Sequence, residues 1–349
     1  LEPTAGRSAA GTVAAASAQL GRPAPGAAGR SAWWGRRGRA LPHPDLVLVH
    51  GAGALPLAAA LRPRFGGARS VMHLHELRTA LGRSAAPGDL QQLTSMDHVM
   101  GVSESVRQLA VDQGVPPERT SVVPGAVDEP PGGWSAPVPE RPPGRPPIDV
   151  VSVGEAGRRK GTDHAIAAAY ELGRLVPGVR WHWVGARPAP GWDVAVGSPT
   201  PLVWHGSSAD PWQVVTEPAA VVIPSREDPL PLVALEAGAR AIPVVAAATG
   251  GLPDLLAADR GLVVPTGDLG ALVDAVRRSI EDPDAAHGRA VRLRQHVHDH
   301  QHEHVDHQHH DHARRGHHPG PRAERSAEQG RRARHRGRPQ HARHRAPRG

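Results

Sequence analysis

Residues 148–174 read IDVVSVGEAGRRKGTDHAIAAAYELGR, and this stretch decides the fold of the second half of the chain. Its apolar run at 148–153 predicts a buried strand, and a helix is predicted over 162–174. The turn between them contains Arg159 and Lys160. In a doubly wound sheet, ligands bind at turns of this kind, and a helix N-terminus offers N–H groups and partial positive charge to phosphate. The stretch therefore predicts an α/β domain with an anion-binding turn.

The same pattern continues towards the C-terminus. Further strands are predicted over 179–184, 202–205, 220–223 and 242–246. Further helices are predicted over 211–217, 231–239 and 268–280. In the last helix, Asp268 is the expected N-cap, and apolar residues recur at helical spacing on one face. Short apolar strands that alternate with helices favour a parallel sheet.

A second α/β series precedes this one. Strands are predicted over 45–50, 70–75, 97–102 and 120–123. Ser103 is a suitable N-cap for a helix over 104–113. The chain is thus expected to have five segments. These are a poorly ordered leader (1–43), a partial first domain (44–128), a proline-rich linker (129–147), a second domain (148–289) and a disordered tail rich in His and Arg (290–349).

Composition excludes several classes of protein. The chain has 349 residues and no cysteine, which excludes disulfide frameworks, thiolate zinc sites and cysteine nucleophiles. The sequence contains no run of 18 apolar residues, so no membrane-spanning helix is predicted. The net charge is +7, but residues 290–349 contain 14 Arg and only six acidic residues, so the remainder is nearly neutral. The only lysine of the chain, Lys160, stands in the turn described above.

Five segments resemble the second domain of family 4 glycosyltransferases, in the order and spacing of that family: 151–161, 221–237, 242–245, 249–254 and 261–268. Residues 44–128 resemble the first domain more weakly. The resemblance implies the GT-B fold, an α/β architecture of two Rossmann-type domains with parallel sheets that face a cleft. The first domain is expected to be incomplete, because the family's first strand and its Gly-Gly loop are not recognisable in residues 1–43. The implied activity is transfer of a hexose from a nucleotide diphosphate sugar to an acceptor hydroxyl, with retention of configuration.

The resemblance also assigns roles to residues of the basic turn. Lys160 and a nearby arginine would bind the donor diphosphate and stabilise it as it leaves, and Gly161 belongs to the same donor-binding turn. Arg159 is the expected arginine, although the family places its arginine earlier, within Glu155–Arg158. A solvated basic turn without function is the alternative for both side chains.

A pair of acids forms the second half of the implied donor site. Asp228 corresponds to a family glutamate that holds the donor sugar, and Glu236 to one that binds the ribose hydroxyls. Glu227 and Leu230 lie beside Asp228 and complete the expected donor-binding set. Carboxylates suit hydroxyl ligands because each can accept more than one hydrogen bond. The family usually has Gly where Pro231 stands, which removes one backbone donor.

The implied catalytic residues are His75, Asp228 and Lys160. His75 and the adjacent acid end a predicted strand, and a histidine there could donate a hydrogen bond or move a proton. The sequence also offers His50 and His73, which remain alternatives to His75.

The resemblance implies no cofactor and no metal, with a UDP-, GDP- or ADP-sugar as donor. The expected partners are that donor and a sugar, lipid or small-molecule acceptor, with no specific nucleic acid. A cytoplasmic location is expected, and a peripheral membrane contact stays open. Two rival functions also stay open: a non-catalytic remnant that binds nucleotide sugars, and polyanion binding through the basic tail. Residues 287–349 contain 15 of the 23 histidines of the chain, and an out-of-frame reading of GC-rich DNA is the preferred explanation for the tail.

Overall fold

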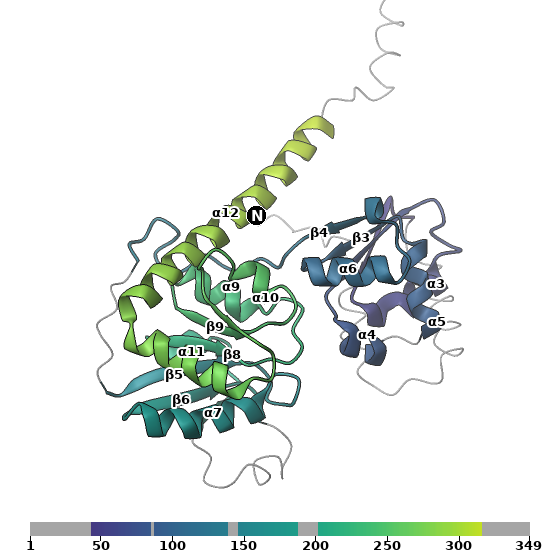
Figure 1. Ribbon diagram of the computed structural model, residues 1–349. Coiled ribbons are helices and arrows are strands. Elements are labelled where there is room, and N and C mark those ends of the chain that lie inside the picture. Colours follow the sequence, from purple (N-terminus) through teal and green to yellow (C-terminus); the bar gives the residue numbers. More distant parts are fainter. Residues whose placement is uncertain (1–42, 85–86, 139–145, 188–201, 316–349) are drawn as a thin grey trace, which may run out of the picture. The chain divides into compact units, whose positions relative to one another are not determined.

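The computed structural model describes residues 43–84, 87–138, 146–187 and 202–315, with side chains described as far as residue 301. These residues form two parallel sheets (Figure 1). The first sheet has the strand order β1-β2-β3-β4, and the second has the order β10-β9-β8-β5-β6-β7. The expected α/β architecture is therefore confirmed. Within the described residues, no helix is long and apolar enough to cross a membrane.

The first domain is built around four short strands: β1 (Leu46–His50), β2 (Arg69–Leu74), β3 (His98–Gly101) and β4 (Thr120–Val122). The connections contain α3 (Leu55–Leu61), α4 (Arg78–Ser84), α5 (Pro87–Leu90) and α6 (Glu104–Asp112), with short 3-10 turns η2 (Ala52–Ala54), η3 (Gln91–Ser95) and η4 (Pro117–Arg119). One apolar core joins the strands to α6, and Met72, Leu74 and Leu93 are fully buried in it. Ser103 occupies the N-cap position of α6, but its side chain makes no capping hydrogen bond.

The second domain has six strands: β5 (Ile148–Val153), β6 (Val179–Val184), β7 (Leu202–Gly206), β8 (Ala220–Ile223), β9 (Val244–Ala247) and β10 (Leu262–Val264). Its helices are α7 (Thr162–Leu175), α8 (Pro211–Val214), α9 (Leu232–Ala239), α10 (Leu252–Leu255), α11 (Leu269–Glu281) and α12 (Pro283–Arg315). The chain starts at β5, builds β6 and β7 on one side, and then returns to place β8 on the other. The strand order reverses between β5 and β8, which is where open α/β sheets bind ligands.

Apolar side chains cover both faces of this second sheet. Alternate residues of one strand enter different cores: Val150 packs with α7 and α11, and Val151 packs with α9 and α12. Trp181 and Trp183 on β6 are buried in the first of these cores. Continuous apolar strands are expected where helices cover both faces of a parallel sheet.

The expected start of a disordered tail at residue 290 is wrong. α12 begins at Pro283 and is helical to Arg315, and Ala290, Leu293 and Val297 are buried. Leu293 and Val297 pack directly against Gly238 in α9. A Cβ atom added to that glycine would lie 2.9 Å from a side-chain carbon of each residue. Three well-spaced apolar residues are enough to anchor this helix, although the surrounding composition is polar. From Asp299 the chain forms a separate unit, and residues 316–349 lie outside the described residues.

The described part of the proline-rich linker is not free of the second domain. Trp134 packs against the core beneath α9 and α12. Arg294 on α12 donates hydrogen bonds to the carbonyls of Gly133 and Trp134, at 3.2 and 2.9 Å. The leader expected at 1–43 lies outside the described residues except for its last residue.

Candidate functional site

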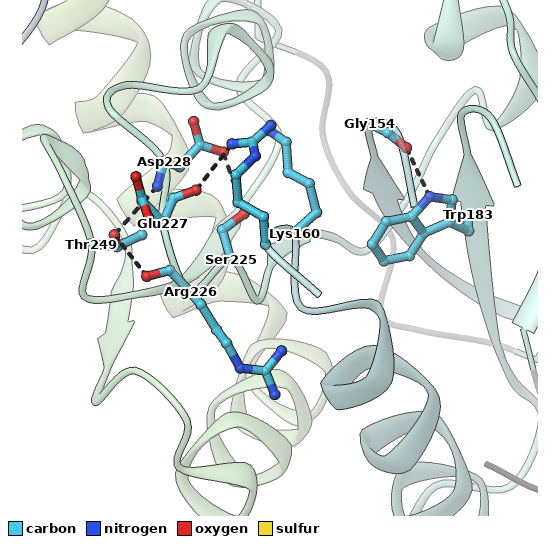
Figure 2. A network of polar contacts seen from close by, with 9 residues as sticks. Gly154, Lys160, Trp183, Ser225, Arg226, Glu227, Asp228 and Thr249 are labelled. Carbon is cyan, nitrogen blue, oxygen red and sulfur yellow. Dashed lines mark hydrogen bonds and ion pairs between the residues drawn. The ribbon is translucent and has the colours of Figure 1, made fainter. Parts of the chain in front are cut away.

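Two loops meet at the point where the strand order of the second sheet reverses. One loop follows β5 and contains Lys160, and the other follows β8 and contains Asp228 (Figure 2). The Lys160 Nζ atom donates a hydrogen bond of 2.6 Å to Asp228 Oδ2. The two side chains are 18% and 6% exposed, so solvent screens this ion pair only in part. Two residues that the sequence predicted for the site are thus in direct contact.

Two glycines allow the loops to approach so closely. Gly161 has a φ of +69°, and a Cβ atom there would lie 1.9 Å from the carbonyl oxygen of Pro224. Gly250 has a φ of +55°, and a Cβ atom there would lie 1.8 Å from the carbonyl oxygen of Asp228. Any other residue at either position would clash with backbone and adopt a strained conformation. The position of Asp228 therefore depends on glycine at both 161 and 250, where a Cβ atom would keep the two loops apart.

Arg159 ties the two loops together instead of projecting into open solvent. Its Nη1 atom donates to the carbonyl of Glu227 at 3.0 Å. In return, the backbone carbonyl of Arg159 accepts from the N–H of Arg226 at 2.8 Å. The predicted phosphate ligand thus already has a structural partner, and Lys160 remains the cation nearest to Asp228 in the described contacts.

Asp228 is buried, with 4% of the residue exposed. Besides Lys160, the Ser225 hydroxyl donates to Asp228 Oδ2 at 3.3 Å. The backbone N–H of Asp228 reaches the Thr249 hydroxyl at 3.4 Å (Figure 2). These two contacts are long for hydrogen bonds, so the lysine is the dominant partner of the carboxylate.

The structure does not bring Glu227 and Leu230 into this ion pair. Glu227 Oε1 accepts hydrogen bonds from the backbone N–H groups of Thr79 and Ala80, at 3.0 Å each. Leu230 is half-buried and packs against apolar core residues. Pro231 caps α9, which begins one residue later at Leu232.

Glu236 has a partner that the sequence analysis missed. Its Oε2 atom accepts a hydrogen bond of 3.2 Å from the indole Nε1 of Trp212, on α8. The Arg240 guanidinium lies over the Trp212 ring, 5.1 Å from its centroid. Trp212 and Glu236 are 24 residues apart, and no motif or spacing in the sequence links them.

The three histidines considered for the first domain form one cluster at the carboxyl ends of β1 and β2. His75 Nε2 lies 3.0 Å from His50 Nδ1, and the rings of His50 and His73 are 5.0 Å apart. Glu76 closes the cluster: its Oε1 atom accepts from the N–H of Ala52 at 2.9 Å. The structure thus does not separate His75 from its alternatives, because all three imidazoles share one site.

Burial and the neighbouring imidazoles alter the chemistry of this cluster. Burial and then the charge of His75 lower the pKa of His50. Burial and then His50 lower the pKa of His73. Imidazoles packed together resist simultaneous protonation, because each positive charge disfavours the next. Among the described residues, no group of His, Asp and Glu has the geometry of a metal site.

Comparisons with known proteins identify both domains. A family model described as glycosyl transferases group 1 matches residues 147–282. A second model, described as glycosyltransferase family 4, matches residues 7–129 and so begins within the segment that was expected to be a leader.

Glycogen synthase of Mycobacterium tuberculosis is 32% identical over 158 residues, which are 43% of this chain and 38% of that enzyme. The chain thus matches well under half the length of this curated relative. Anabaena HepE in complex with UDP-glucose superposes with a TM-score of 0.60 at 19% identity, over 77% of each chain. Sucrose-phosphate synthase from Thermosynechococcus elongatus gives a TM-score of 0.58 at 21% identity, over 78% of this chain and 72% of that one. Residues 147–282 therefore match the group 1 glycosyltransferases and residues 7–129 match glycosyltransferase family 4, and the chain has the GT-B fold.

Proposed function

We propose that this protein transfers a hexose from a nucleotide diphosphate sugar to an acceptor hydroxyl with retention of configuration. The observation that carries this proposal is the ion pair of Lys160 and Asp228 at the strand-order reversal of the second sheet. It combines a cation for a diphosphate with a carboxylate for sugar hydroxyls, and each is a member of a family motif.

The ion pair also suggests how a donor would bind. A diphosphate at the start of α7 would compete with Asp228 for the Lys160 ammonium. Once released from the lysine, the Asp228 carboxylate would accept hydrogen bonds from hydroxyls of the donor sugar. Such an exchange pairs the lysine with phosphate and leaves the carboxylate hydrogen-bonded to hydroxyls, so neither buried charge is left without a partner.

In the proposed reaction, the bond between the sugar C1 and the diphosphate oxygen breaks, and a bond between C1 and the acceptor oxygen forms on the same face. The proton of the acceptor hydroxyl passes to the leaving phosphate oxygen. Lys160 would stabilise the charge that develops on the diphosphate, as a fixed charge in a partly desolvated site. His75, within its cluster of imidazoles, would donate a hydrogen bond to the transferred sugar.

Donor binding by the full chain tests the first half of this proposal. Isothermal titration with UDP-, GDP- and ADP-glucose is expected to give a dissociation constant for at least one donor, and K160Q is expected to weaken it by about tenfold or more, the effect of losing one charge-assisted contact. Equal dissociation constants for the wild type and K160Q would contradict the assigned site.

Product analysis tests the second half. With the donor that binds, incubation with a panel of sugar acceptors is expected to yield a product whose anomeric proton coupling matches that of the donor. Inverted product would contradict retention. Donor binding without any transfer would instead support the rival function, a nucleotide-sugar-binding protein without catalysis.

A further inference from the structure

The guanidinium of Arg226 links the same two loops on the side away from the Lys160–Asp228 pair. It donates to both carboxylate oxygens of Asp163, at 2.6 Å each, and to the carbonyl of Arg158 at 2.8 Å. Its fourth contact is His164 Nε2, at 2.7 Å. Figure 2 shows the Arg226 side chain pointing away from Asp228, so it does not itself face the ion pair.

These contacts connect three pieces of backbone that surround Lys160. Arg158 lies in the basic turn, Asp163 lies in the first turn of α7, and Arg226 lies in the loop after β8. Backbone hydrogen bonds run in parallel, because the Arg159 carbonyl accepts from the N–H groups of Arg226 and Glu227, at 2.8 and 3.4 Å. A bidentate pair of arginine and carboxylate fixes orientation as well as distance.

The Arg226 guanidinium influences the protonation of both side chains that it contacts, Asp163 and His164. Burial would raise the pKa of Asp163, but the hydrogen bonds and charge of Arg226 outweigh it and hold that pKa below its usual value. Burial and then the charge of Arg226 lower the pKa of His164. Since arginine can only donate, His164 Nε2 must accept, which places the ring proton on Nδ1.

We propose that Arg226 and Asp163 are positioning residues of the donor site: their bidentate pair holds the turn of Lys160 in register with the loop of Asp228. This inference deepens the proposed function and rests on it for the identity of the ligand. The proposal also says that the Lys160–Asp228 contact depends on Arg226, and this part can be tested without any donor.

The chain has a single lysine, so digestion of the reacted chain assigns its acetylation to one peptide, separate from that of the α-amino group. The rate of acetylation of Lys160 by a dilute amine-reactive reagent, followed by mass spectrometry of that peptide, reports how firmly its ammonium is held. R226Q and D163N are expected to raise this rate by about fivefold, the factor that corresponds to about 1 kcal/mol. R226K keeps the charge but loses the planar fork, so its Lys160 rate, read from the peptide that contains Lys160 and not from the new lysine, is expected to lie between those of the wild type and R226Q.

R180Q is the matched control. Arg180 makes a bidentate pair with Asp149 in the same domain, at 2.7 and 2.8 Å, but away from the two loops of the site. Arg180 is more exposed than Arg226, so thermal unfolding of each variant is measured alongside its reactivity. We expect R180Q to leave the Lys160 rate within about twofold of the wild type, a difference below 0.5 kcal/mol.

Two outcomes would overturn the inference: an unchanged Lys160 rate in folded R226Q, or an equal increase in R226Q and R180Q. With a donor, R226Q is expected to weaken binding by about tenfold, the loss of about 1.4 kcal/mol. A wild type that binds no nucleotide sugar would contradict the proposed function but leave the lysine-reactivity result standing, so the two failures are distinguishable.

Discussion

The two domains place polar side chains at corresponding positions, after the carboxyl ends of parallel strands, but the chemistry of these side chains differs. At the carboxyl ends of β1 and β2 of the first domain lie three imidazoles and one glutamate, and burial lowers the pKa values of two of these imidazoles, His50 and His73. After β5 and β8 of the second domain lie lysine, arginine and aspartate in close ion pairs. The titratable imidazoles of the first region contrast with the ion pairs of the second. Under the proposed function, the first region would handle hydroxyl protons and the second a diphosphate.

The largest effect is expected from closing the space between the two charged loops. G161A would place a Cβ atom 1.9 Å from a backbone oxygen at a positive φ, so we expect it to lower the free energy of unfolding by more than about 3 kcal/mol. G157A is the control, because a Cβ there meets nothing within 4 Å. Urea denaturation measures both variants. Similar losses in the two would show that the loops do not need their close approach.

Separating the charged pair should come next. K160M leaves the buried Asp228 carboxylate without its main partner, and we expect a loss of about 3 kcal/mol in unfolding free energy. The double variant K160M/D228N removes both charges and should recover at least half of that loss. A double-mutant cycle from urea denaturation checks this. If the losses of K160M and D228N simply add in the double variant, the two side chains are not coupled. The charged region of the second domain would then depend less on charge than its geometry implies.

A smaller effect is expected at Trp212. W212F keeps the ring but removes the indole N–H that binds Glu236, a hydrogen bond worth about 1 kcal/mol. If Glu236 binds the donor ribose, W212F should raise the KM for the donor about fivefold with little change in kcat. W134F, in the same apolar core, is the control and should change neither constant. A lowered kcat with an unchanged KM would instead contradict a role in donor binding.

The smallest effect should come from acidification, which tests the titratable side of the comparison. His50 and His73 have lowered pKa values in the folded chain, so between the usual value of 6.5 and those lower values the unfolded chain binds more protons. Stability is therefore highest above pH 6.5 and falls as the pH decreases below it. We expect Tm to drop by a few degrees between about pH 7.5 and pH 5.5.

His164 and His205 in the second domain also have lowered pKa values, so a double variant is needed to assign the loss. H50Q/H73Q should reduce the drop in Tm. An undiminished drop in that variant would place the pH sensitivity in the second domain and weaken the contrast between the two regions.

Much of the fold was predictable because its strands are short apolar runs between helices. The strands at 148–153, 179–184 and 220–223 were predicted with the residues that the structure gives them. Predictions failed where a few residues decide the outcome. β10 has only three residues and was not predicted, and α12 was hidden because its buried residues are separated by charged and histidine side chains.

The sequence by itself was enough to propose the residues of the candidate site, since motif order placed Lys160 and Asp228 in loops after predicted strands and Glu236 in the helix that follows the second loop. Only the tertiary structure decided how these residues pair. The Lys160–Asp228 and Asp163–Arg226 contacts join residues more than 60 positions apart, and the Trp212–Glu236 contact joins different helices. The physical reason is that strand order brings distant loops to one edge of a sheet, and local sequence patterns hold no information about that order.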